Sequence, residues 1–159
     1  RVLKPGRAFW YFTNWQEAWW FQQRFYTFLR NEVISDKGNW TAGHLEGSLG
    51  NKYEVIFLGT KGSGWKLRGG REHDIWDDIP RMGTKRIHPT EKPIALYKKI
   101  IEMSTEEGAW ILDSYGGSGS SAIAALELNR SIIMYELDQE YHSRIIRRIE
   151  EWSGTFSSR

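Results

Sequence analysis

The sequence predicts an α/β fold built on a strand–helix–strand crossover. The apolar run at 109–112 has the length of a strand, and residues 122–129 are typical of a helix. A second apolar run at 131–138 closes with an acid, Glu136. The first strand and the helix are joined by the glycine-rich stretch DSYGGSGSS at 113–121. This order forms the first half of a nucleotide-binding crossover.

The glycine turn favours a ligand that lies directly against the backbone. Glycine has no Cβ, so a ligand can approach where a side chain would block it. Gly117 and Gly119 do not continue into the dinucleotide spacing G-x-G-x-x-G, and no G-K-[ST] follows. Glu136 falls where a carboxylate can accept hydrogen bonds from two ribose hydroxyls. The pattern predicts a nucleoside ligand without a pyrophosphate, and a plain structural turn is the alternative.

A second motif, HPTEKP at 88–93, precedes an amphipathic segment. Its two prolines predict an extended entry to a helix. Thr90 or Glu91 is placed to cap that helix, and Gly108 to end it. The alternative is a rigid loop before an ordinary helix, which explains the prolines but not the polar residues between them.

Together these motifs resemble those of the S-adenosylmethionine-dependent DNA amino-methyltransferases. HPTEKP, a helix, D-x-[FY]-G-G-S-G-[ST] and a strand ending in E-[LI]-D follow in that family's permuted order, with the catalytic motif before the cofactor motif. The resemblance extends to about Trp152 and includes three segments similar to the helix exit and strands of the family: 1–12, 31–39 and 51–62. Ser114 and Tyr115 replace the usual Pro and Phe, which are mild departures.

The resemblance implies a Rossmann-like methyltransferase sheet with helices on both faces, incomplete in this chain. Residues 1–159 then form one partial methyltransferase domain, with a short target-recognition-like loop at 61–87.

The resemblance also implies which residues bind S-adenosylmethionine. The turn lines the methionine and ribose part, Glu136 holds the ribose, and Leu137 lies beside the adenine. His88, Thr90 and Lys92 close over the methionine end. The implied cofactor-binding residues are Asp113, Ser114, Tyr115, Gly116, Gly117, Ser118, Gly119, Glu136, Leu137, His88, Thr90 and Lys92.

The catalytic motif of the resembled family, Asp, Asn or Ser before Pro-Pro and an aromatic, is absent, because no two prolines are adjacent. Its expected place is upstream of Arg1, so we interpret the chain as the C-terminal portion of a longer polypeptide. The family's sheet carries that motif between the strands at 109–112 and 8–12. We expect a missing N-terminal segment or a partner chain to fill this gap, and no methyl transfer by this chain alone.

The expected function of the parent protein is methylation of an exocyclic amine in double-stranded DNA, adenine more than cytosine. Such an amine is a poor nucleophile because its lone pair is delocalised into the ring. In the resembled family, the first side chain and a proline carbonyl of the catalytic motif accept its hydrogens and localise the lone pair, while the aromatic stacks on the flipped-out base. The methyl transfer itself then gains mainly from positioning. The alternative is a non-catalytic subunit that binds the cofactor or DNA. The sequence leaves open the recognition site, a homodimer and an accompanying nuclease of a restriction–modification system.

Basic residues cluster between 61 and 86, although the net charge of the chain is only +2. Lys and Arg contact phosphates, which makes DNA binding one interpretation and a solvated connector the other. The predicted DNA-binding residues are Lys61, Lys66, Arg68, Arg71, Arg81, Lys85 and Arg86.

Aromatic residues cluster in a helical pattern between 9 and 28. Steps of three and four residues predict that one side of this helix faces the core, with base stacking as the alternative. The predicted core side comprises Trp15, Ala18, Trp19, Phe25, Tyr26 and Leu29. Trp20 and Phe21 lie off that side, exposed or covered by the missing segment.

Several classes of protein are excluded or disfavoured. The chain has no cysteine, which rules out disulfides and thiolate metal ligands. No histidine pair has metal-ligand spacing with an acid, so we expect no metal. No apolar run reaches the roughly 18 residues that span a bilayer, and no signal peptide is present, so we expect a cytoplasmic protein without a membrane partner.

Overall fold

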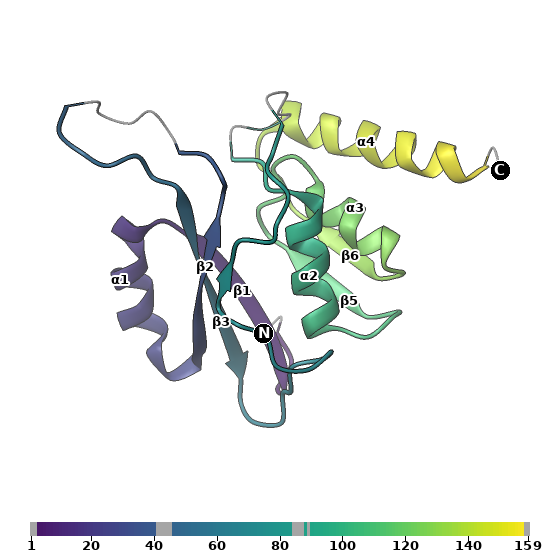
Figure 1. Ribbon diagram of the computed structural model, residues 1–159. Helices are drawn as coiled ribbons and strands as arrows, with labels where there is room; N and C mark the ends of the chain where they lie inside the picture. Colours follow the sequence, from purple (N-terminus) through teal and green to yellow (C-terminus); the bar gives the residue numbers. More distant parts are fainter. Residues whose placement is uncertain (1–2, 41–45, 84–87, 89, 158–159) are drawn as a thin grey trace. The chain divides into compact units, whose positions relative to one another are not determined.

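The computed structural model describes residues 3–40, 46–83, 88 and 90–157 (Figure 1). The chain divides into two compact units, Arg1–Arg81 and Met82–Arg159, each with its own sheet. The expectation of one partial domain is not tested by this division and stays a prediction.

The first unit is a four-stranded sheet with one helix, α1, beside it (Figure 1). The strand order is β1-β3-β2-β4, in which β3 is antiparallel to both neighbours and β4 is parallel to β2. The elements are β1 (Arg7–Thr13), α1 (Trp15–Phe25), the 3-10 helix η1 (Tyr26–Phe28), β2 (Leu29–Asp36), β3 (Tyr53–Lys61) and β4 (Ile75–Trp76). The strands predicted at the start of the chain and near 31–39 and 51–62 are therefore confirmed.

The core of the first unit joins α1 to the sheet through stacked aromatic rings. Phe21 lies with its ring 3.7 Å from that of Tyr11 and 5.5 Å from that of Phe57. Asn14 caps the helix, because its side-chain oxygen accepts hydrogen bonds from two first-turn N–H groups.

The predicted core side of α1 is wrong at three of its six positions. Trp15, Trp19 and Tyr26 are 56%, 59% and 75% exposed, whereas Phe21 is buried. The buried side is centred on Phe21, about one residue around the helix from the predicted side. Both sides carry aromatic residues at helical spacing, so periodicity alone did not distinguish them.

The remaining positions agree with the prediction. Ala18, Phe25 and Leu29 pack against the buried cluster, and Trp20 is exposed. Ala18 and Phe25 lie three residues before and four after Phe21, which is the spacing of one helix side.

The second unit contains the predicted crossover. Its elements are α2 (Ile94–Ser104), β5 (Trp110–Asp113), α3 (Ser120–Glu127), β6 (Ser131–Met134) and α4 (Gln139–Ser157). Strands β5 and β6 are parallel neighbours, and α3 connects them. The core between the sheet and the helices α2 and α3 includes Ile101, Ala124 and Ala125, with Ile111 and Ile132 from the strands packed against it.

Three predicted boundaries in the second unit are wrong. Helix α2 begins at Ile94 without a side-chain cap, so neither Thr90 nor Glu91 caps it. It ends at Ser104, because Thr105 adopts extended backbone, and Gly108 belongs to the following turn. Strand β6 ends at Met134, so the predicted strand is too long. The side chains of Glu91 and Glu136 instead form hydrogen bonds at the glycine turn.

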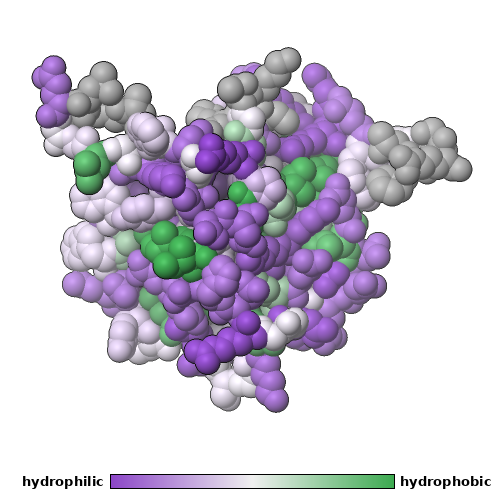
Figure 2. Space-filling model, in the orientation of Figure 1, coloured by the Kyte–Doolittle hydropathy of each residue, from purple (hydrophilic) through white to green (hydrophobic). Residues whose placement is uncertain are grey.

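The predicted α/β class and Rossmann-like strand–turn–helix–strand order are confirmed. In the view of Figure 2, charged and polar side chains cover most of the surface, with apolar side chains in small separate groups. Among the described residues, every helix is too short or too polar to cross a bilayer.

Substitution Phe21→Ala tests the core of the first unit. Truncation of this buried ring is expected to lower the free energy of unfolding by about 3–5 kcal/mol, since it removes stacking and leaves a cavity. The control Trp19→Ala, on the exposed side of the same helix, should cost less than about 1 kcal/mol. Chemical denaturation measures both. Equal losses in the two variants would contradict the observed orientation of α1.

Candidate cofactor-binding site

The site begins where β5 runs into the glycine turn. Asp113 organises this turn with both carboxylate oxygens: Oδ1 accepts a hydrogen bond from the Tyr115 N–H at 2.9 Å, and Oδ2 accepts one from the Ser121 hydroxyl at 2.5 Å. Asp113 therefore ties the start of the turn to the first residues of α3.

Glycine is required in the turn for two separate reasons. Gly117 and Gly119 have φ of +54° and +77°, a region that side chains rarely adopt. At Gly116 the obstacle is space, because an added Cβ would lie 2.7 Å from the Met134 sulfur. The turn thus packs directly on β6 while its backbone adopts a left-handed bend.

Glu136 lies just beyond the end of β6 and reaches back to the turn. Its Oε2 accepts a hydrogen bond from the Gly117 N–H at 2.6 Å, and its Oε1 accepts one from the Asp138 N–H at 2.9 Å. The Asp138 N–H, followed by that of Gly117, lowers the pKa of Glu136 from its ordinary value. The group is therefore an ionised acceptor, with lone pairs left for further hydrogen bonds.

Described residues of the HPTEKP motif lie beside the same turn. An added Cβ on Gly117 would lie 3.7 Å from the His88 ring, and that ring also packs edge-on against Tyr141 with centroids 4.3 Å apart. The Thr90 hydroxyl lies 3.0 Å from His88 Nδ1, and Lys92 Nζ donates to the Thr90 carbonyl. The structure thus brings His88, Thr90 and Lys92 together with the turn.

The remaining predicted residues differ in exposure. Tyr115 is 85% exposed, and Leu137 is fully exposed immediately after Glu136. Ser118 is buried, with its hydroxyl 3.0 Å from that of Ser120. Ser114 is exposed in the turn. The site therefore combines a buried polar base with an open, partly apolar rim.

Sequence reasoning missed two residues that bear on this site, Arg148 and Glu91. Arg148 of α4 donates to the Ser118 carbonyl at 2.8 Å and to the Glu91 carboxylate at 3.0 Å. Glu91 was interpreted only as a helix cap. The position of Glu91 between Thr90 and Lys92 could have marked it as a site residue. Nothing in the sequence, however, pairs Glu91 with Arg148, which lies 57 positions away.

Part of the basic segment at 61–86 is fixed by contacts within the first unit. Trp76 of β4 is buried, its ring lies 5.8 Å from that of Trp10, and β4 pairs with β2. Lys61 donates to the Leu3 carbonyl at 2.6 Å. The other described members of the predicted DNA-binding set are exposed: Lys66, Arg68, Arg71 and Arg81. Lys85 and Arg86 lie outside the described residues.

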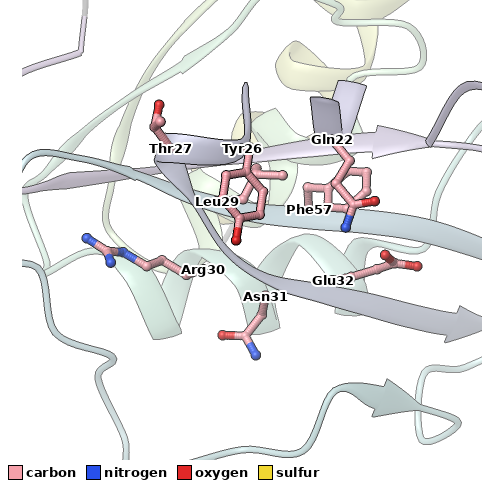
Figure 3. Close-up of a pocket in the computed structure, with 8 residues that line it drawn as sticks. All are labelled: Gln22, Tyr26, Thr27, Leu29, Arg30, Asn31, Glu32 and Phe57. Carbon is pink, nitrogen blue, oxygen red and sulfur yellow. The ribbon is translucent and has the colours of Figure 1, made fainter. Parts of the chain in front are cut away.

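A separate hollow occurs in the first unit, around η1 (Figure 3). It is lined by Gln22, Tyr26, Thr27, Leu29, Arg30, Asn31, Glu32 and Phe57, beside an irregularity in the register of β2. In Figure 3, Arg30 and Glu32 extend away from each other. None of its lining residues belongs to the predicted cofactor-binding or DNA-binding residues. Within the described part of the chain, no group of His, Asp and Glu is arranged to hold a metal.

A family model described as DNA methylase matches residues 1–147. The chain belongs to this family. The predicted resemblance to the amino-methyltransferases is thereby confirmed, while the order of the motifs is not tested.

YubD of Escherichia coli (strain K12) is 29% identical over an alignment of 163 residues that covers 89% of this chain. DNA adenine methyltransferase YhdJ of the same strain is 36% identical over 81 residues, or 48% of this chain.

Solved structures show the same fold. The crystal structure of the M1.HpyAVI–SAM complex matches with a TM-score of 0.78 and 22% identity over 92% of this chain and 76% of that chain. PvuII DNA methyltransferase, named as cytosine-N4-specific, matches with a TM-score of 0.78 and 15% identity over 92% of this chain and 64% of that chain. The chain spans 61% of the length of YubD and 27% of that of YhdJ.

The hydrogen bonds of Glu136 predict a pH dependence of stability. Its folded-state pKa lies below the ordinary value of 4.5, so the ionised carboxylate stabilises the folded chain above that pH. This contribution should be lost as the pH falls through the folded-state pKa. The parent chain should therefore have a higher free energy of unfolding than Glu136→Gln at neutral pH. This difference should shrink as the pH falls.

Denaturation with urea across a series from neutral pH to below 4.5 measures this difference. The control Leu137→Ala alters an exposed neighbour and should keep the pH profile of the parent chain. If the free energies of unfolding of the parent and Glu136→Gln differed by the same amount at every pH, the lowered pKa of Glu136 would be contradicted.

Proposed function

We propose that the glycine turn of the second unit binds S-adenosylmethionine. We further propose that the protein to which this chain belongs transfers the methyl group to an exocyclic amine of a base in double-stranded DNA. Membership of the DNA methylase family supports this function, and the predicted cytoplasmic location belongs to the same proposal.

The observation that carries the proposal is the carboxylate of Glu136 beside a bare backbone turn. Each of its oxygens accepts one backbone N–H, which fixes the side chain and leaves acceptor capacity for two ribose hydroxyls. Leu137 offers an exposed apolar side chain for the adenine, immediately after the acid. The same combination suits the nucleoside half of S-adenosylmethionine, which has no pyrophosphate to be bound.

The opposite end of the turn fits the methionine half. Asp113 is ionisable and lies at the mouth of the turn, and Lys92 and Thr90 supply further polar groups beside His88. In this proposal these groups orient the amino acid end, while bound S-adenosylmethionine supplies a methyl group on a sulfonium sulfur. The contribution of this chain is positioning, which accounts for much of the rate of an in-line transfer.

Adenine is the proposed target base, with cytosine as the alternative. The name of YhdJ specifies adenine, and that of PvuII methyltransferase specifies cytosine N4. The second candidate is a non-catalytic subunit that binds the cofactor or DNA. That candidate requires cofactor binding without methyl transfer to DNA, even from the longest polypeptide that contains this chain.

Substitution Glu136→Ala tests the cofactor site. Loss of hydrogen bonds to a charged acceptor should weaken S-adenosylmethionine binding by about 1–3 kcal/mol, roughly 5- to 150-fold. Isothermal titration calorimetry on the full chain measures the affinity. Glu140→Ala, which removes an exposed acid one turn along the chain, should bind like the parent. Equal affinity of the parent and Glu136→Ala would refute the ribose role.

Substitution Arg68→Ala tests the basic segment. If Arg68 neutralises a phosphate, its removal should weaken binding to any DNA duplex and make the salt dependence of log K shallower by about one unit. The control Arg147→Ala removes an exposed arginine of α4, outside the segment. Fluorescence anisotropy at several salt concentrations measures both. An unaltered salt slope for Arg68→Ala would indicate that the segment is a connector.

A further inference from the structure

Arg148 and Glu91 form a largely buried ion pair in the second unit. The Arg148 guanidinium lies 3.0 Å from the Glu91 carboxylate, and the side chains are 20% and 5% exposed. Buried charges are retained only where partners and hydrogen bonds offset their desolvation. The pair is therefore a specific arrangement rather than a chance surface contact.

The same guanidinium nitrogen connects the pair to the glycine turn. Arg148 Nη1 donates to the Ser118 carbonyl at 2.8 Å and to the Ser120 hydroxyl at 3.3 Å, in addition to Glu91. The Ser120 hydroxyl in turn lies 3.4 Å from Glu91 Oε1. One side chain of α4 thus joins the HPTEKP motif, the turn and the start of α3.

Glu91 occupies the centre of the segment that lies beside the turn. Its own N–H donates to the His88 carbonyl at 3.0 Å, and the Thr90 N–H donates to His88 Nδ1 at 3.2 Å. Thr90 is exposed and Lys92 only partly buried, whereas Glu91 is buried. Glu91 is thus the side chain through which this stretch is anchored to Arg148, while its neighbours stay accessible to a ligand.

We propose that the Glu91–Arg148 pair positions His88, Thr90 and Lys92 against the glycine turn and thereby sets the affinity for the cofactor. The inference rests on the proposed binding of S-adenosylmethionine. Arg148 acts through other groups and is a positioning residue. Because its donors point to Glu91 and to the turn at once, a change here alters the spacing between the two halves of the site.

The test uses Arg148→Met and Glu91→Gln in the full chain, with Arg148→Lys as the conservative variant. The control is Lys98→Met, which removes an ion pair between α2 and α3 with Glu127 and leaves the turn untouched. Amide hydrogen exchange by NMR reports on Thr90 and Glu91 for the segment, and on Ala124 and Ala125 for the buried core. Calorimetry with S-adenosylmethionine reports on affinity.

Both Arg148→Met and Glu91→Gln should raise exchange at Thr90 and Glu91 at least about tenfold, the change for one charged hydrogen bond, and leave Ala124 and Ala125 unchanged. Affinity should fall by a similar factor, Arg148→Lys should recover part of both effects, and Lys98→Met should match the parent. If Arg148→Met does not fold, Glu91→Gln and Arg148→Lys decide the question.

Unchanged exchange at Thr90 and Glu91 would overturn the inference. An equal rise at Ala124 and Ala125 would do the same, since it would reveal a general loss of stability. Faster local exchange with unaltered affinity would overturn the link to the cofactor. A parent chain that binds no S-adenosylmethionine but shows the local exchange response would refute the proposed function and leave the positioning role standing.

Discussion

The hydrogen bond from the Gly117 N–H to Glu136 is the interaction on which the site of the second unit depends. It joins the turn after β5 to the segment after β6, so the ends of two parallel strands form one surface. Gly116 makes this approach feasible, because a side chain there would collide with Met134. Since the acceptor is ionised, the bond is stronger than one between neutral groups. The turn is consequently held open toward solvent in a defined shape.

The side chains around this turn divide into two sets. Asp113, Glu91 and Arg148 hold backbone segments in place through contacts at 2.5–3.0 Å. Leu137 and Tyr115 make no comparable contribution to packing and are exposed. A rigid base with an open rim suits a ligand that is bound, altered and released, because the ordering entropy of the base is already lost on folding.

Residue types and their spacing were sufficient to predict the crossover, the glycine turn and the acid beside it. Glycine at sterically restricted positions, alternating strand and helix patterns, and an acid after the second strand are local signals. They depend on conformational preferences that act over a few residues. The HPTEKP motif was instead recognised by its resemblance to a family motif. The predicted helix cap at Thr90 or Glu91 was wrong, because Pro93 already sets the entry to α2 and frees Glu91 for another partner.

By itself, the sequence determined the α/β class, the glycine turn and the acid after the second strand, because these follow from short patterns with steric or chemical causes. The family was indicated by the resemblance of its motifs, and that resemblance also placed His88, Thr90 and Lys92 beside the turn. Only the tertiary structure decided which aromatic side of α1 is buried, since Trp19 and Phe21 are both large aromatic residues and packing against the sheet selects one. It also decided that Arg148 pairs with Glu91. Pairing across 57 positions depends on where α4 lies over the turn, and no local pattern encodes that placement.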